Sequence, residues 1–169
     1  MKRIIWVLMV MVLLSGCVNM TEPVFETVND PAAEPVAAEP APVWVWMPET
    51  AAAQTAAEEG SSCYTWDDCE LRVQTMKGGD IQGTLETLTG MSAQRLTVME
   101  YKRGELQMYQ TVWSMTGEEG ITLGRCLVAD DGAYHYCISL LSPENADVED
   151  TYARICASLD LSGEERIEK

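Results

Sequence analysis

The stretch Ile121–Leu141, ITLGRCLVADDGAYHYCISLL, consists of two apolar segments joined by Asp130-Asp131-Gly132. An Asp-Gly pair between two such segments is the strongest short-range signal for a β-hairpin, because both residues tolerate a positive φ. We therefore expect antiparallel strands over 121–129 and 133–141. This hairpin indicates a sheet built by local pairing of strands.

Polar and apolar residues also alternate upstream, as they do in half-buried strands. The pattern predicts a strand over Glu70–Met76 and a second over Arg95–Tyr101. A turn at residues 102–105 then leads into a third strand that ends near Met115, and Gly117-Glu118-Glu119-Gly120 forms the next turn.

Two helices are expected. Lys77-Gly78-Gly79 ends the first strand, and Asp80 can cap a short helix that ends at Gly90. Its apolar residues recur at helical spacing: Ile81, Leu85 and Leu88. Ser142-Pro143 is typical of a helix start, with proline at the first helical position. The helix from there to about Ser158 shows one apolar face: Val148, Tyr152, Ile155 and Leu159.

The expected order is a strand, a helix, four meandering strands and a helix. Helices packed on an antiparallel meander sheet make an α+β domain. We place this domain at residues 61–169, and that length is sufficient for one hydrophobic core.

Residues 18–60 differ in composition. They contain six of the seven prolines, eight acidic residues and no Lys or Arg. Proline removes backbone donors and like charges repel, so we expect residues 17–60 to be a disordered, extended tether. Val43-Trp44-Val45-Trp46 is an exception: it either docks on the domain or on a partner, or is incidental.

The N-terminus combines a basic head, Met1-Lys2-Arg3, with an apolar run from Ile4 to Leu14. These are the parts of a secretory signal, and the run is too short to span a bilayer. Leu14-Ser15-Gly16-Cys17 resembles the lipobox of bacterial lipoproteins. The resemblance implies cleavage after residue 16 and a diacylglyceryl group on Cys17, which would anchor the chain at the outer side of a cell membrane.

Cleavage would remove Lys2 and Arg3 and change the net charge from −16 to −18. So acidic a chain is repelled by phosphate backbones, and we expect no nucleic-acid partner.

The last third of the chain resembles PsbP-like α/β/α sandwich domains. The resemblance rests on Ala133-Tyr134-His135-Tyr136, Pro143, Tyr152 and Ile155-Cys156-Ala157-Ser158-Leu159. It covers about 40 residues as a pattern of apolar positions, and it implies an architecture without assigning a functional residue.

Five cysteines follow Cys17. If Asp131-Gly132 is a two-residue turn, Cys126 lies opposite Cys137, so a Cys126–Cys137 disulfide is possible, and Cys63–Cys69 could close a second small loop. Cys156 is then left over as a buried helix residue. The alternative is that all five are reduced apolar fillers.

No metal or cofactor is expected. The chain has no Cys-x-x-Cys pair, and its single histidine, His135, could at most join Cys126 and Cys137 in a cluster. The acidic doublets Asp67-Asp68, Glu118-Glu119 and Asp130-Asp131 lack the spacing of a calcium loop and suit turns.

The sequence contains no nucleophile elbow and no nucleotide-binding glycine loop. We therefore expect a non-enzymatic module that is anchored through Cys17 and binds an envelope protein, a peptide or a small ligand, or scaffolds an assembly. A small redox protein or enzyme that uses the domain cysteines is the second hypothesis.

Overall fold

The computed structural model describes residues 39–54, 60–118 and 120–163. The chain divides into residues 1–36 and 37–169, and every described residue belongs to the second unit. The signal segment, the lipobox and Cys17 lie outside the described residues.

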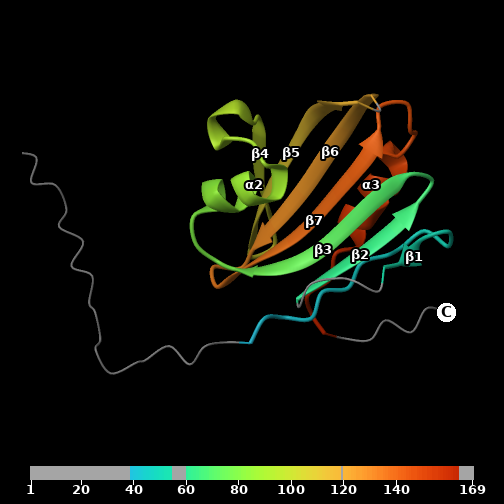
Figure 1. Ribbon diagram of the computed structural model, residues 1–169. Helices are drawn as coiled ribbons and strands as arrows, with labels where there is room; N and C mark the ends of the chain where they lie inside the picture. Colours follow the sequence, from blue (N-terminus) through green and yellow to red (C-terminus); the bar gives the residue numbers. More distant parts are fainter. Residues whose placement is uncertain (1–38, 55–59, 119, 164–169) are drawn as a thin grey trace, which may run out of the picture. The chain divides into compact units, whose positions relative to one another are not determined.

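The domain is a seven-stranded antiparallel sheet with helices on both faces, so the predicted α+β class is confirmed (Figure 1). The strands lie in the order β1-β2-β3-β7-β6-β5-β4. Their bounds are β1 Ala52–Ala53, β2 Ser61–Trp66, β3 Cys69–Lys77, β4 Val98–Arg103, β5 Leu106–Gly117, β6 Gly120–Asp130 and β7 Tyr134–Pro143.

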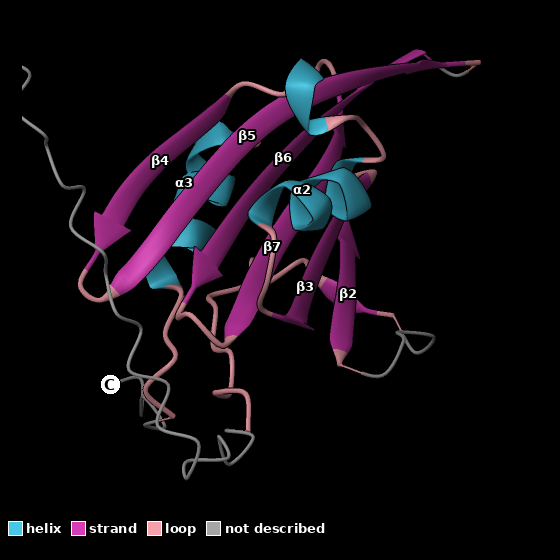
Figure 2. Cartoon of the chain, turned by 90° about the vertical axis from the view of Figure 1, so that its left-hand side faces the viewer, coloured by secondary structure: helices cyan, strands magenta, loops and turns pink. Residues whose placement is uncertain are grey.

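The path of the chain explains this order. Helix α2, Ile81–Thr89, and the 3-10 turn η1, Ala93–Arg95, carry the chain from β3 across one face of the sheet to β4 at the far edge (Figure 2). Strands β4 to β7 then meander back until β7 pairs with β3. The sequence predicted this meander but missed β1 and β2.

Helix α2 begins and ends as its sequence predicts. The Asp80 carboxylate accepts hydrogen bonds from the backbone N–H groups of Gln82 and Gly83, at 3.1 and 3.3 Å. Gly90 ends the helix with a φ of 67°, a conformation that costs glycine little.

Helix α3, Glu149–Ser158, starts six residues later than the predicted start at Pro143. Pro143 instead closes β7, opposite Thr122. Glu144 N–H donates to Ile121 O of β6, so the nitrogen of the preceding residue, Pro143, points away from β6 and toward the β3 side. The pairing of β7 with β3 has already ended at Leu141. Proline therefore loses no ladder bond there.

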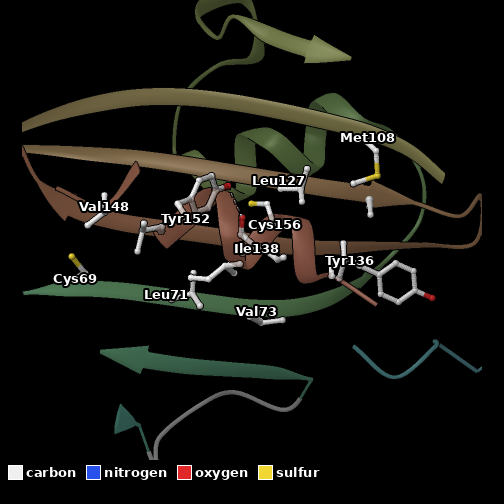
Figure 3. Packing of buried hydrophobic residues seen from close by; sticks show 14 of the residues in the cluster. Cys69, Leu71, Val73, Met108, Leu127, Tyr136, Ile138, Val148, Tyr152 and Cys156 are labelled. Atoms are coloured by element: carbon white, nitrogen blue, oxygen red, sulfur yellow. Dashed lines mark hydrogen bonds between the residues drawn. The ribbon is translucent and has the colours of Figure 1, made fainter. Parts of the chain in front are cut away.

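The helices cover opposite faces of the sheet, and side chains alternate between two cores. The larger core lies between α3 and the sheet (Figure 3). Val148, Tyr152, Ile155 and Leu159 form the predicted helix face there. The smaller core packs Leu85 of α2 on Trp113, Cys126, Val128 and Cys137. We call the two sides the α3 face and the α2 face.

The β6–β7 hairpin is present with a different loop. Asp130 pairs with His135, so four residues separate the last paired positions where the predicted turn had two. The Asp131 carboxylate explains the longer loop: it accepts hydrogen bonds from the N–H groups of Ala133 and Tyr134 and from the Tyr136 hydroxyl, at 2.7–2.8 Å. The register moves by two residues, and Cys126 now pairs with Ser139.

Residues 39–54, which we call the strap, lie on the domain and not in a tether. Trp44 exchanges two backbone hydrogen bonds of 2.9 Å with Asp160, and Trp46 N–H donates to Ser158 Oγ at 2.7 Å. The Arg154 guanidinium carbon lies 3.8 Å from the centre of the Trp46 ring. The folded unit therefore extends N-terminally beyond residue 61, because these apolar residues find partners on α3 and the sheet.

Candidate functional site

An open groove runs along the α3 face, between α3 and the strands β4 and β5. Helix α3 packs on the middle of the sheet and on the Met108 end of β5, so most of β4 and the rest of β5 remain uncovered on this face. The groove has a volume of about 730 Å³. That size is typical of ligand-binding clefts.

The groove is lined mainly by apolar side chains. Met99 and Tyr101 of β4 and Val112 of β5 are 58%, 37% and 62% exposed, and all three line it. Ala153 and Ala157 of α3 form part of the opposite wall. Neighbouring apolar side chains that stay open to solvent on a stable sheet are a usual mark of a binding surface.

Arg103 joins β4 to the C-terminal end of α3. Its guanidinium donates hydrogen bonds to the backbone carbonyls of Cys156, at 3.1 Å, and Leu159. The last carbonyls of a helix lack partners within the helix, and a cation is favoured there by the helix dipole. Arg103 therefore holds the two walls of the groove together.

A second arginine lines the groove from β6. Arg125 lies 3.1 Å from the Glu149 carboxylate in the first turn of α3, and it donates to Ser142 Oγ at 3.3 Å. The groove thus contains two guanidinium groups and one carboxylate among its apolar walls. A few polar groups in an apolar cleft are the usual means of orienting a ligand.

Neither predicted disulfide is present, and the five cysteines of the described chain are free. The corrected register places Cys126 opposite Ser139 and Cys137 opposite Val128, so the two thiols are not a facing pair. Cys63 pairs with Arg72, while Cys69 pairs with Trp66 beside the two-residue turn. Because strand side chains alternate, Cys63 and Cys69 point to opposite faces of the sheet.

The thiols are poor nucleophiles at neutral pH. Burial raises the pKa of Cys126 and Cys137 to about 12 and the pKa of Cys156 to about 11. Burial also raises the pKa of Cys69, and it raises that of the half-buried Cys63 with help from the nearby Glu70 carboxylate. A thiol must be deprotonated to attack a substrate or bind a metal, so these pKa values oppose both roles.

His135 does not line the groove, and the alternation of side chains along β7 places it on the α2 face with Cys137. It is completely buried, and its Nδ1 lies 2.8 Å from the Thr84 hydroxyl of α2. Its Nε2 has no hydrogen-bond partner and is 3.8 Å from Asp130 Oδ2. In the described part of the chain, no three histidine, cysteine or acidic side chains gather as a metal site would require.

The two acidic doublets that the structure describes in full, Asp67-Asp68 and Asp130-Asp131, serve as turn residues. Asp67 and Asp68, with φ values of 45° and 61°, form the turn between β2 and β3. Burial works to raise the pKa of Asp131, but the hydrogen bonds from Tyr134, Tyr136 and Ala133 outweigh burial and lower that pKa. The pKa follows from the structural role of this carboxylate in the hairpin loop.

Sequence reasoning did not find the groove. Alternation placed Met99 and Val112 in strands, but it could not show which strands α3 leaves uncovered. None of the helices in the described ranges has the length and apolar character needed to cross a bilayer.

No protein-family model matches the sequence, and no curated protein matches it. The structure is similar to a crystal structure of a protein from Bacteroides thetaiotaomicron, with a TM-score of 0.52 and 14% identity. The similarity covers 75% of this chain and 47% of the other, so the chain spans about half of that neighbour. It shows the fold alone, and the resemblance to PsbP-like domains stays a prediction.

Proposed function

We propose that the protein is a lipoprotein of the cell envelope whose domain is a non-enzymatic binding module, with the groove between α3 and β4–β5 as its ligand site. The observation that carries this proposal is the groove itself: about 730 Å³, lined by three exposed apolar side chains of neighbouring strands. The ligand is an apolar molecule or apolar peptide segment.

The proposed lipid anchor at Cys17 is inferred from the sequence. Leu14-Ser15-Gly16-Cys17 has the residue types and spacing of a lipobox, and two acyl chains are sufficient for stable membrane attachment. Metabolic labelling with an alkyne-bearing fatty acid, followed by detection on the purified chain, tests it. The label should disappear in Cys17→Ala, and a label retained by that variant would exclude lipidation at this residue.

The binding site can be tested with Nile red, a neutral dye that fluoresces in apolar surroundings. Wild-type protein should give a saturable fluorescence increase. Val112→Lys places a charge on the floor of the groove, and we expect it to weaken dye binding about tenfold, because burying an unpaired charge is costly. Val112 is largely exposed, so the fold should tolerate the change.

Met115→Lys is the matched control. Met115 lies three residues along the same strand, so it faces the opposite side of the sheet, and it is 40% exposed. The Met115→Lys variant introduces the same charge outside the groove and should leave dye affinity unchanged. Equal dye binding by both variants would show that the groove is not the site.

The alternative function, a redox protein or enzyme using the cysteines, predicts a different result. It requires at least one thiol that reacts rapidly in the native protein at pH 7. We expect only Cys63 to react with a thiol reagent, and slowly, because the other four described thiols are buried. Rapid reaction of a buried thiol would favour the alternative.

A further inference from the structure

The edge strand β4 offers a second candidate interface: its open backbone edge, which is distinct from the side chains that line the groove. It lies at one end of the sheet, and no described strand pairs with its outer side (Figure 2). The opposite edge, β1, has two residues, whereas β4 has six. Four consecutive residues of β4, Met99 to Lys102, are exposed. An exposed strand of this length is a template for pairing with another strand.

The backbone groups available for pairing follow from the β4–β5 hairpin. Arg103 pairs with Leu106 across the two-residue loop Gly104-Glu105. Residues that flank such a loop exchange both backbone hydrogen bonds, and bonded and non-bonded residues then alternate. The N–H and C=O groups of Val98, Glu100 and Lys102 therefore point to the open side of β4.

The charges of β4 are unusual for a protected edge. Glu100 and Lys102 lie two residues apart on the same face, and neither forms a salt bridge with another described residue. Charges of one sign would repel a second copy of the same strand. One acid and one base, spaced in this way, can instead complement the same pair on a second copy.

We propose that β4 pairs antiparallel with β4 of a second copy of the chain, about a twofold axis at Tyr101. In this register Glu100 of each copy lies opposite Lys102 of the other, which gives two ion pairs related by symmetry. Met99 lies opposite Arg103, and the two Tyr101 residues face each other. Such an interface is isologous, the commonest kind in homodimers.

Hydrogen bonding and charge select this register over its neighbours. Val98, Glu100 and Lys102, whose backbone groups face outward, must lie opposite one another in the two copies. The twofold axis must therefore pass through a residue and cannot pass between two residues. An axis at Glu100 would place the two Glu100 carboxylates face to face, and an axis at Lys102 would do the same for the two ammonium groups. Like charges directly opposite are destabilising, so the axis at Tyr101 remains.

In this dimer the two sheets join edge to edge into one continuous sheet. The two grooves would then lie side by side, because Met99 and Tyr101 line the groove on the α3 face. Pairing through β4 does not depend on the groove binding a ligand. The failure of either proposal therefore leaves the other standing.

Cysteine cross-linking of the full-length protein, in membranes of expressing cells, tests the register. In a Cys63→Ser background, Tyr101→Cys should form a disulfide-linked dimer on mild oxidation, since directly opposed residues outside the hydrogen-bonded pairs have Cα atoms about 4.5 Å apart. Glu100→Cys is the control: in this register it opposes Lys102, and its cross-linking should be at least fivefold weaker. Equal cross-linking at the two positions, or none at Tyr101→Cys, would overturn the proposal.

Charge reversal tests the ion pairs. Association is measured by analytical ultracentrifugation of the full chain in detergent at physiological ionic strength, where the large net charge is screened beyond about 8 Å. Glu100→Lys and Lys102→Glu should each weaken the homodimer about tenfold, because two attractive pairs become repulsive. The double variant should restore it.

Mixing the two single variants provides the decisive comparison. Each variant edge then carries charges of one sign, opposite to those of the other variant, so the heterodimer should be tighter than either variant homodimer. Thermal denaturation of each variant checks that it is folded. A monomeric wild type, or no recovery in the double variant and in the mixture, would refute the pairing.

Discussion

Single residues in this fold are constrained by contacts that their type alone does not reveal. Gly124 in β6 lies directly under the Trp113 ring, and a Cβ added there would meet ring atoms at 2.1 Å. Trp113 belongs to the core of the α2 face and cannot move freely.

Gly124→Ala should therefore lower the free energy of unfolding by about 1–3 kcal/mol, the usual cost of overpacking a core. Urea denaturation followed by tryptophan fluorescence measures it. Gly79→Ala is the control, because a Cβ at Gly79 would meet no atom within 4 Å. Equal stability of the two variants would contradict the close packing at Gly124.

The buried thiols make stability depend on alkaline pH. Cys126 and Cys137 have a folded-state pKa of about 12, above the ordinary value of 9.0. Between these values the unfolded chain loses thiol protons that the folded chain retains. Deprotonation thus stabilises the unfolded state, and the free energy of unfolding falls as pH rises from about 9 to 12.

Urea denaturation at pH 8, 9.5 and 10.5 should show this loss. The double variant Cys126→Ala, Cys137→Ala should lose less stability over the same range, even though it starts from a lower value. Identical pH slopes for the variant and the wild type would mean that these thiols do not titrate as their burial requires.

At the scale of elements, the Arg103 side chain links β4 to the end of α3. Arg103 satisfies two carbonyls at the end of α3, and hydrogen bonds from a charged group contribute about 1.5–3 kcal/mol each. Arg103→Lys keeps the charge but loses the two-pronged geometry.

We expect Arg103→Lys to speed hydrogen exchange at the last turn of α3 severalfold while α2 stays unchanged. Hydrogen exchange read by mass spectrometry distinguishes the two helices. Faster exchange in both would indicate a global loss of stability and not the release of this contact.

Helix α2 was predicted correctly because Asp80 and Gly90 act locally on their own backbone. The β6–β7 register was wrong by two residues because the Asp131 carboxylate stabilises a four-residue loop, and the same error suggested a Cys126–Cys137 disulfide.

The later start of α3 and the groove depend on longer-range relations. Pro143 is tolerated in β7 only because β3 has already ended beside it. The groove exists because one short helix cannot cover seven strands. Neither relation is visible before the strands are placed side by side.

The whole molecule depends on the strap for a complete core. Val43, Val45, Trp46 and Met47 pack against the larger core, and Ala41 N–H donates to the Tyr136 hydroxyl at 3.0 Å. Residues 61–169, the domain expected from sequence, omit all of these contacts.

A chain of residues 61–169 should therefore be less stable than residues 37–169 and should bind more of a dye that recognises exposed apolar surface. Thermal denaturation of the two chains makes the comparison. Equal melting temperatures would show that the strap adds nothing to the fold. Trp46→Ala in the longer chain should reproduce part of the loss, since it removes the contact with Arg154.

The strap has a mechanical consequence if the chain is anchored through a lipid at Cys17, as proposed above. A pull from the membrane would reach the strap first. The strap is held by the bridge at Trp44, a few side-chain contacts, apolar packing and the two-residue pairing of β1 with β2. The sheet, whose strands are joined by long ladders, would resist far larger forces. Released residues 39–60 would extend to about 70 Å, at ~3.3 Å per residue. The strap would then act as a reserve of chain length, which yields under tension before the binding domain unfolds.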